Sequence, residues 1–185
     1  MSKTERRDLL VKLGLEDSIV FENPDYDSAI IGYDDNTDRV VYSFEAMAVE
    51  LAEQDGIDYD ESIEFIEYNT LRAIPYMGSL SPIVMYSIDD MEYFFGMIED
   101  GNDFIKYIPA LKEYDDSIIG YDATSGRVVY DFENMVEVLM RKDNISYECA
   151  VEEIKNHSFA ENIIIEEGYE PIILRSIEDY LDYSK

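Results

Sequence analysis

The pattern of hydrophobic and polar positions in this chain occurs twice in the same order. Residues 26–44 match residues 114–132 in register and without a gap, at an offset of 88 positions. A self-match of this length is typical of a tandem duplication. It predicts two similar units of roughly 65–75 residues each, a size near the lower limit for an independent core, so we expect the units to pack on each other.

Each unit is predicted to begin with a β-hairpin. Apolar runs rich in β-branched residues flank a polar turn, at Asp34–Asp38 in the first unit and at Asp122–Gly126 in the second. Gly32 and Gly120 recur at the same place in the first strand, which indicates a β-bulge or a close backbone contact.

A helix is predicted to follow each hairpin. Ser43 and Asp131 are residue types preferred at an N-cap, while Gly56 and Asn144 are types that tolerate the left-handed turn at a helix end. Between the cap and the end, apolar residues recur at i, i+3 and i+7 and define one buried face.

A second helix is predicted after Asp58 in the first unit and after Ser146 in the second. The residues expected on its inner face are Tyr59, Ile63 and Ile66, and Tyr147, Val151 and Ile154. The acids on its outer face in the first unit are Asp60, Glu61, Glu64 and Glu67. No Lys or Arg relieves the repulsion among these acids, whereas the second unit has Lys155, so we expect the first unit to have the stronger acidic surface.

A third strand, predicted at 82–86 and at 171–175, and a helix that begins at Ser87 or Ser176 complete each unit. Because the hairpin strands are adjacent and antiparallel, this order predicts an α+β fold in which helices cover a small sheet in each unit. A short basic helix is predicted over residues 2–13, and we expect it to dock on the acidic body. The predicted domains are 1–22 (N-terminal helix and lead-in), 23–88 (first repeat unit), 89–112 (bridging helix and linker) and 113–185 (second repeat unit).

Net charge narrows the classes of partner. The chain has 43 Asp and Glu against 14 Lys and Arg, a formal net charge of −29, and between residues 13 and 105 only Arg39 and Arg72 are basic. Such a field repels nucleic acids and anionic membranes and attracts basic proteins. Solubility or a halophilic origin is the alternative explanation, but the chain keeps its large apolar residues, and a hydrophobic content of 46% argues against disorder.

Cysteine usage and the lack of long apolar runs predict a cytoplasmic protein. Cys149 is the only cysteine, which excludes an intramolecular disulfide and suits a reducing compartment. No apolar run approaches the length of a membrane span, and no apolar segment of the signal-peptide type follows the basic N-terminus.

A calcium site in the first hairpin turn is the nearest approach to a metal motif. Asp34, Asn36, Asp38 and Glu45 fit positions of an EF-hand loop, but Arg39 occupies the position where the tight turn needs glycine. A polar hairpin turn explains these residues better, so no metal ligand is predicted.

Catalytic signatures are weaker still. Cys149 and the only histidine, His157, lie eight residues apart on one predicted helix, about 12 Å, which is too far for a nucleophile and its base. Paired carboxylates could serve a glycosidase, but with 43 acids some pair will always lie close. The chain has no glycine-rich phosphate loop, no Cys/His metal spacing and no nucleophile elbow, so we expect no enzyme and no cofactor.

Tyrosine is unusually frequent, with 16 residues and no tryptophan. Several tyrosines adjoin acids, and two interpretations of them stay open. They pack in the core, or they form a protein-binding surface in which tyrosine supplies contact area and carboxylates pair with Arg and Lys. The tyrosines concerned are Tyr26, Tyr33, Tyr59, Tyr68, Tyr93 and Tyr114.

The repeated segments carry a family resemblance. Ala29–Gly32, Arg39–Tyr42 and Glu64–Thr70, with their counterparts, resemble small acidic proteins of phages and prophages in Firmicutes-type bacteria over residues 26–88 and 114–180. A small, intensely acidic chain without enzyme signatures also looks like phage anti-defence proteins, particularly anti-CRISPR inhibitors of Cas9. The resemblance implies a phage or prophage origin and a bacterial host cell, and it brings no catalytic motif.

The function expected from charge and resemblance is a non-enzymatic inhibitor that mimics DNA. Acids at i, i+4 and i+7 lie about 5–6 Å apart along a helix axis, a spacing comparable to that of successive phosphates. A basic DNA channel, as in Cas9 or a similar nuclease, could accept such a helix and lose its access to DNA. The alternative is an acidic adaptor or regulatory module that binds another basic protein. The expected partner-binding residues are Asp34, Asp35, Asp38, Asp58, Asp60, Glu61, Glu64, Glu67, Glu99, Asp100 and Asp103.

Overall fold

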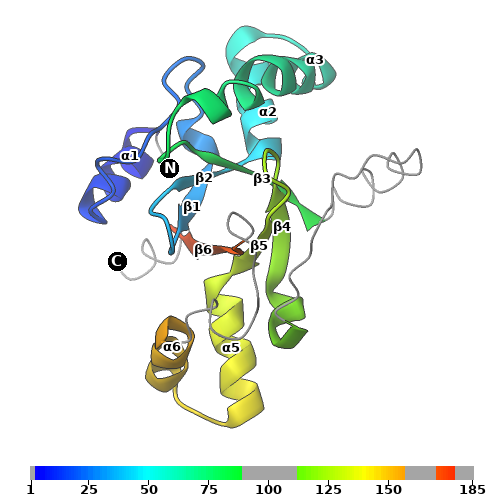
Figure 1. Ribbon diagram of the computed structural model, residues 1–185. Coiled ribbons are helices and arrows are strands. Elements are labelled where there is room, and N and C mark those ends of the chain that lie inside the picture. Colours follow the sequence, from blue (N-terminus) through cyan, green and yellow to red (C-terminus); the bar gives the residue numbers. More distant parts are fainter. Residues whose placement is uncertain (1–2, 89–111, 157–169, 178–185) are drawn as a thin grey trace, which may run out of the picture.

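The computed structural model describes residues 3–88, 112–156 and 170–177, which form an α+β fold around six strands closed into a barrel (Figure 1). The strands are β1 (Ile30–Asp34), β2 (Val40–Ser43), β3 (Ile83–Ser87), β4 (Ile118–Asp122), β5 (Val128–Asp131) and β6 (Ile172–Ser176). The α-helices are α1 (Lys3–Lys12), α2 (Phe44–Asp55), α3 (Tyr59–Phe65), α5 (Phe132–Asp143) and α6 (Tyr147–Asn156). The shorter elements are the 3-10 helices η1 (Asp27–Ala29), η3 (Ile74–Tyr76) and η5 (Lys112–Ser117) and the π-helix η2 (Ile66–Leu71).

Strand pairing follows the same order in the first half (residues 26–88) and the second half (residues 114–177). In each half the hairpin strands are antiparallel, and the third strand runs parallel to the second, because helices cross over between them. The halves join through the antiparallel pairs β3–β4 and β1–β6.

The closed barrel corrects the expectation of one small sheet in each unit. A three-stranded sheet has two open edges of unpaired backbone N–H and C=O groups. Here each edge of one half pairs with an edge of the other, so the six strands form one barrel. The helices predicted to begin at Ser87 and Ser176 extend beyond residues 88 and 177 and lie outside the described residues.

The repeated glycines lie where the two halves join. The register shifts between Ile30 and Gly32 in β1, and the pairing of β4 shifts in the same way beside Gly120. A Cβ added at Gly32 would lie 2.0 Å from the carbonyl oxygen of Arg175 in β6, and one at Gly120 would lie 2.1 Å from that of Tyr86 in β3. Both the bulge and the close backbone contact predicted from the sequence are therefore confirmed.

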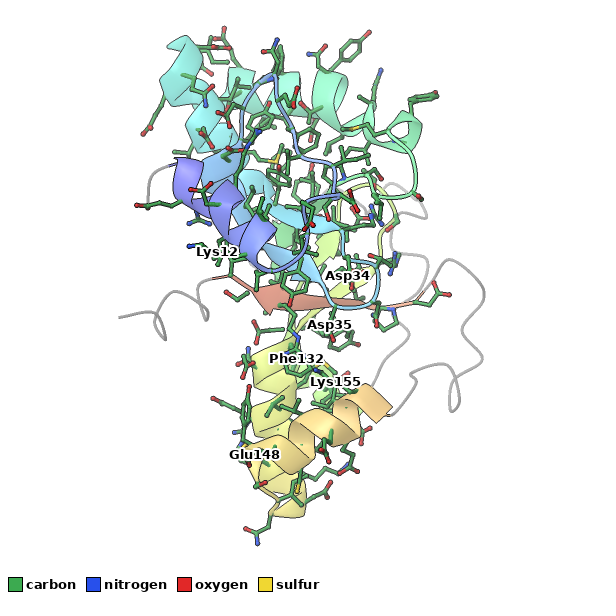
Figure 2. The ribbon with its side chains drawn as sticks, turned by 90° about the vertical axis from the view of Figure 1, so that its left-hand side faces the viewer. Lys12, Asp34, Asp35, Phe132, Glu148 and Lys155 are labelled. Carbon is green, nitrogen blue, oxygen red and sulfur yellow. The ribbon has the colours of Figure 1, made fainter. Side chains whose placement is uncertain are left out.

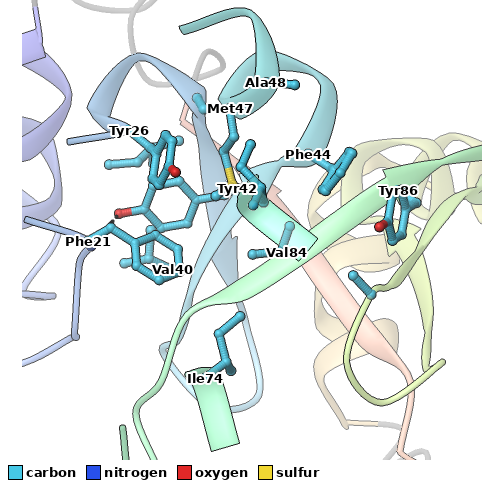
Figure 3. Packing of buried hydrophobic residues seen from close by; sticks show 14 of the residues in the cluster. Phe21, Tyr26, Val40, Tyr42, Phe44, Met47, Ala48, Ile74, Val84 and Tyr86 are labelled. Carbon is cyan, nitrogen blue, oxygen red and sulfur yellow. Dashed lines mark hydrogen bonds between the residues drawn. The ribbon is translucent and has the colours of Figure 1, made fainter. Parts of the chain in front are cut away.

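Three apolar clusters stabilise the molecule. The barrel interior is filled by Val41, Ile83, Met85, Val129, Ile172 and Leu174. On the outside of the first half, α2, α1 and the segment after α1 cover the strands, and buried rings such as Tyr26 and Tyr42 meet there (Figure 3). On the outside of the second half, α5 and α6 cover the strands in a smaller cluster.

The helix ends are those that the sequence predicts. Ser43 accepts a hydrogen bond from the Ala46 N–H at 3.3 Å, and Asp131 accepts one from Asn134 at 2.8 Å. Gly56 (φ 67°) ends α2 in the left-handed conformation, and Asn144, with φ 53°, ends α5 in the same way. The structure therefore confirms the predicted boundaries of α2 and α5.

The basic N-terminal helix docks on the first half, as expected. Arg7 donates a hydrogen bond to the carboxylate of buried Asp27, and a second one at 2.9 Å to the carbonyl of Phe21. Leu10 is 3% exposed in the apolar cluster below the helix. α1 is thus held by an ion pair and by apolar burial together.

Candidate acidic surface

The five predicted acids of the second helix form one exposed surface, which we call the acidic face. Its members are Asp58, Asp60, Glu61, Glu64 and Glu67, all exposed. Asp58 is the N-cap of α3 and accepts a hydrogen bond from the Glu61 N–H at 2.8 Å. α3 lies at one end of the molecule, and α5 and α6 lie at the other, with the barrel between them (Figure 1).

The backbone under the acidic face differs from the single α-helix that the sequence predicts. α3 ends at Phe65, and the chain continues as the π-helix η2. Asp60 and Glu64 therefore share an α-helical row, but Glu67 lies on a wider turn and leaves the predicted i+7 position. Its carboxylate accepts a hydrogen bond from the Tyr86 hydroxyl at 3.5 Å.

The excess of acids is much larger on the helices of the first half. Residues 44–68 carry nine Asp and Glu and no Lys or Arg, a formal charge of −9. The matching residues 132–156 carry six acids and three bases, a formal charge of −3. Such a difference gives the end of the molecule around α3 the stronger negative field.

Exposed tyrosine side chains occur in the segment of the acidic face and shortly after it. The exposed fractions are 42% for Tyr59, 65% for Tyr68 and 90% for Tyr76. The guanidinium of Arg72 lies over the Tyr68 ring, 4.4 Å from its centroid. Tyrosine beside carboxylate is a combination that suits protein contacts.

The tyrosines next to acids divide between the two interpretations. Tyr26 and Tyr114 are buried, and burial raises both pKa values, that of Tyr114 to about 12. Tyr59 and Tyr68 are exposed, so the inward orientation expected of Tyr59 was wrong, as it was for Tyr147, which is 44% exposed. The other residues predicted to face inward do so: Ile66 and Ile154 are buried, and Ile63 and Val151 are partly buried against the apolar clusters. Tyr33 is half-buried, and Tyr93 lies outside the described residues.

Asp34 is not a surface residue, which corrects its place among the predicted partner contacts. It is fully buried, and its carboxylate accepts hydrogen bonds from the Ile173 N–H at 3.1 Å and from the Thr37 hydroxyl at 2.6 Å. Asp122, 1% exposed, holds the second hairpin turn through Ser125 at 2.5 Å. Both buried carboxylates are thus satisfied by hydrogen bonds within the fold.

The other two acids of the first turn differ from each other. Asp35 pairs with Arg175 of β6 at 2.9 Å, and its side chain is 28% exposed (Figure 2). Asp38 is exposed and has a φ of 58°, and its carbonyl accepts a hydrogen bond from Ser18 at 2.6 Å. Of this turn, only the Asp38 carboxylate remains available as a predicted surface contact.

A groove beside the acidic face has no counterpart in the sequence predictions. Its volume is about 750 Å³, and it runs between residues 16–24 and residues 65–77. Asn69 and Thr70 of the π-helix line it, together with Phe65 and Met77. The wall formed by residues 16–24 is irregular, and the groove depends on how it lies against residues 65–77, so hydrophobic periodicity could not reveal the groove.

Metal and catalytic groupings are not brought together in the part of the chain that the structure describes. There, no three His, Cys, Asp or Glu side chains come within reach of one ion. Cys149 is exposed on α6, and His157, Glu99, Asp100 and Asp103 lie outside the described residues. No helix within the same ranges is both long and apolar enough to cross a membrane.

No family model, no curated protein and no solved structure matches the chain.

Proposed function

We propose that this protein is a non-enzymatic acidic inhibitor that binds a nucleic-acid-handling enzyme and blocks its access to DNA. The observation that carries the proposal is the exposed acidic face of α3 and η2, in a stretch of 25 residues (44–68) that contains no basic side chain. Carboxylates held on an ordered surface can pair with the Lys and Arg side chains that otherwise contact phosphates.

A guide-loaded Cas9 is the enzyme to test first. Its PAM-reading arginines and its positively charged channels for heteroduplex and displaced strand are surfaces that a DNA mimic would occupy. Because Glu67 lies on the wider turn of η2, we treat the acidic face as a patch of charge and not as one α-helical row. The proposal therefore rests on charge density over the patch and needs no match to successive phosphates. It places the protein in the cytoplasm of a bacterial host, as a product of a phage or prophage.

Charge reversal of the acidic face tests the proposal. Glu61, Glu64 and Glu67 are changed to Lys together, and the control changes Glu148, Glu152 and Glu153 of α6, which are exposed at the other end of the molecule. We expect the first variant to lose inhibition of target-DNA binding by guide-loaded Cas9 and to show a flatter salt dependence, while the control inhibits as the parent does. Equal inhibition by both variants would exclude the acidic face as the contact.

An acidic adaptor that binds another basic protein is the second candidate. The exposed rings of Tyr59, Tyr68 and Tyr76 favour it, because a surface that only mimics phosphates has no need of aromatic contact area. Competition decides between the two: DNA displaces a DNA mimic from its partner and leaves an adaptor bound. The complex is first formed with nuclease, so that bridging nucleic acid is removed, and the nuclease is washed away before the competing DNA is added.

We also infer that the two halves arose by tandem duplication. Support comes from the ungapped match of residues 26–44 with 114–132 and from the equivalent places of Gly32 and Gly120 at the two joins. On this hypothesis, the first half kept or gained acids after duplication and acquired α1. Matched substitutions at equivalent positions then have matched effects wherever the halves still agree.

A further inference from the structure

The groove between residues 16–24 and 65–77 has an aromatic floor. Phe21 and Tyr26 are buried, and their rings meet edge to face with centroids 5.7 Å apart. The buried hydroxyls of Tyr26 and Thr70 lie 3.3 Å apart and satisfy each other. An apolar side chain that enters the groove can bury its surface against the exposed ring of Phe65 and the small accessible part of Phe21.

The rim of the groove is acidic. Glu16 and Glu22 are exposed on one wall, and none of the described lining residues is Lys or Arg. On the other wall Phe65, 36% exposed, directly follows Glu64 of the acidic face. The groove and the acidic face are therefore adjacent in the chain, and both present negative charge to a ligand.

The wall formed by η2 is a π-helix, a backbone form that is rare overall but is often found at functional sites. In η2, Ile66 and Thr70 are buried, while Asn69 is exposed and lines the groove. The wide turn thus keeps apolar contact with the body and leaves a polar side chain on the wall beside the aromatic floor.

The geometry points to a binding site for a basic segment of a partner protein that carries one apolar side chain between Lys or Arg residues. The apolar side chain occupies the groove against Phe21 and Phe65, and the flanking cations pair with Glu16 and Glu22. This inference deepens the proposed function and rests on it, because it assumes that the partner is basic. Charge complementarity selects this occupant over an acidic or neutral segment.

Three short labelled peptides test the site by fluorescence anisotropy at low ionic strength. The first has a central Leu flanked by Lys and Arg, the second replaces Leu by Ser, and the third keeps Leu and replaces the cations by Glu. We expect the first peptide to bind about tenfold or more tightly than the second, through the apolar surface that Leu buries. The third peptide is expected not to bind, because the rim repels it.

Three variants separate the groove from the general negative charge. Ala73→Trp fills the groove from an exposed position and should remove the preference for Leu over Ser, whereas Ala73→Ser should keep it. Glu16→Gln with Glu22→Gln should weaken the binding of both basic peptides and preserve the ratio of their affinities. The Glu16→Gln and Glu22→Gln double variant changes only exposed side chains, so it remains informative if Ala73→Trp does not fold.

Three results would overturn the site. They are equal affinity for the Leu and Ser peptides, failure of both to bind, and binding of the acidic Leu peptide as tightly as the basic one. None of the three decides the proposed function. That function is tested separately, by competition with DNA and by the variant in which Glu61, Glu64 and Glu67 are changed to Lys. If the unmodified protein does not inhibit the enzyme but still prefers the Leu peptide, the inhibitor is rejected and the groove is retained.

Discussion

The two halves of the barrel share their strand pairings and differ in the charge of their helices. α5 ends with Arg141 and Lys142, cations that a helix C-terminus favours, and Lys142 pairs with Glu113 at 2.6 Å. α2 has no base in its last turn and ends in acids. Stability alone does not explain acids at a helix C-terminus followed by the like-charged α3. Local rules are broken most often at functional sites, and here the first half breaks them.

The two joins between the halves differ in chemistry. At the β3–β4 join, Tyr86 packs on Phe44 and stacks on Tyr121, with centroid distances of 4.4 Å and 5.3 Å. At the β1–β6 join, Arg175 takes the place that corresponds to Tyr86. Its guanidinium carbon lies 3.1 Å from the ring centroid of Phe132, and the guanidinium pairs with Asp35. One join is aromatic and the other ionic, although the backbone pairing is the same.

The largest expected effect comes from the feature that the halves share. Gly32→Ala or Gly120→Ala places a Cβ about 2 Å from a carbonyl oxygen of the adjacent strand, and that backbone must move. Each substitution should destabilise the protein by about 4 kcal/mol or more, since it opens a join of the barrel. Urea unfolding followed by circular dichroism measures the loss.

Gly56→Ala is the control for these glycines. Gly56 has a φ of 67° but nothing within 4 Å of an added Cβ, so the cost should be about 1 kcal/mol, from backbone conformation alone. A large loss at Gly32 with none at Gly120 would contradict the equivalence of the two joins.

Local features of this fold are predictable from sequence, and contacts between distant segments are not. The caps Ser43 and Asp131, the helix ends and all six strands follow from residue types and spacing within a few positions. The choice of strand partners does not, because a three-stranded unit can satisfy its edges in several ways. The barrel depends on contacts such as Asp34 with Ile173, which are 139 residues apart.

The acidic surface was predictable in part for the same reason. The acids of α3 are exposed as their helical spacing predicts, and Asp34, in a polar turn, is buried by a strand from the other half. The π-helix carries no residue signal in Ile66–Leu71, and the groove depends on how residues 16–24 lie against it. The burial of Asp34, the π-helix and the groove each depend on packing between segments that are distant in the sequence.

The next largest effect is expected at α1, the docked N-terminal helix that only the first half has. Leu10→Ala removes a side chain that is 3% exposed and should cost about 2–3 kcal/mol, because a cavity is left between α1 and the body. Val11→Ala, at a position 59% exposed, is the matched control and should change stability little. Thermal unfolding measures both. Equal melting temperatures for the two variants would show that α1 adds nothing to the apolar cluster on the outside of the first half.

The ionic join should be sensitive to salt. Asp35→Asn, Arg175→Met and the double variant form a cycle, and the expected coupling is about 1–2 kcal/mol because the Arg175 side chain is only 12% exposed. High ionic strength should reduce the coupling. A Tyr86→Leu and Tyr121→Leu cycle across the aromatic join is the comparison and should keep its coupling at high salt. Identical salt responses would remove the distinction between the joins.

The smallest expected effect is a pH dependence confined to the first half. Burial raises the pKa of Asp27 above its ordinary 3.8, although Arg7 donates to it, and its Oδ1 meets no donor among the described residues. Between 3.8 and the raised value the folded state binds more protons than the unfolded state, so stability falls as pH rises through that window. Asp27→Asn should abolish this fall, which amounts to about 1.4 kcal/mol for each pH unit between the unfolded and folded pKa values. Asp115→Asn, at the equivalent but exposed position, controls for the loss of one charge. Urea unfolding across the window would contradict the assignment if wild type gained stability over Asp27→Asn as pH rose, because a net pairing with Arg7 would then outweigh burial.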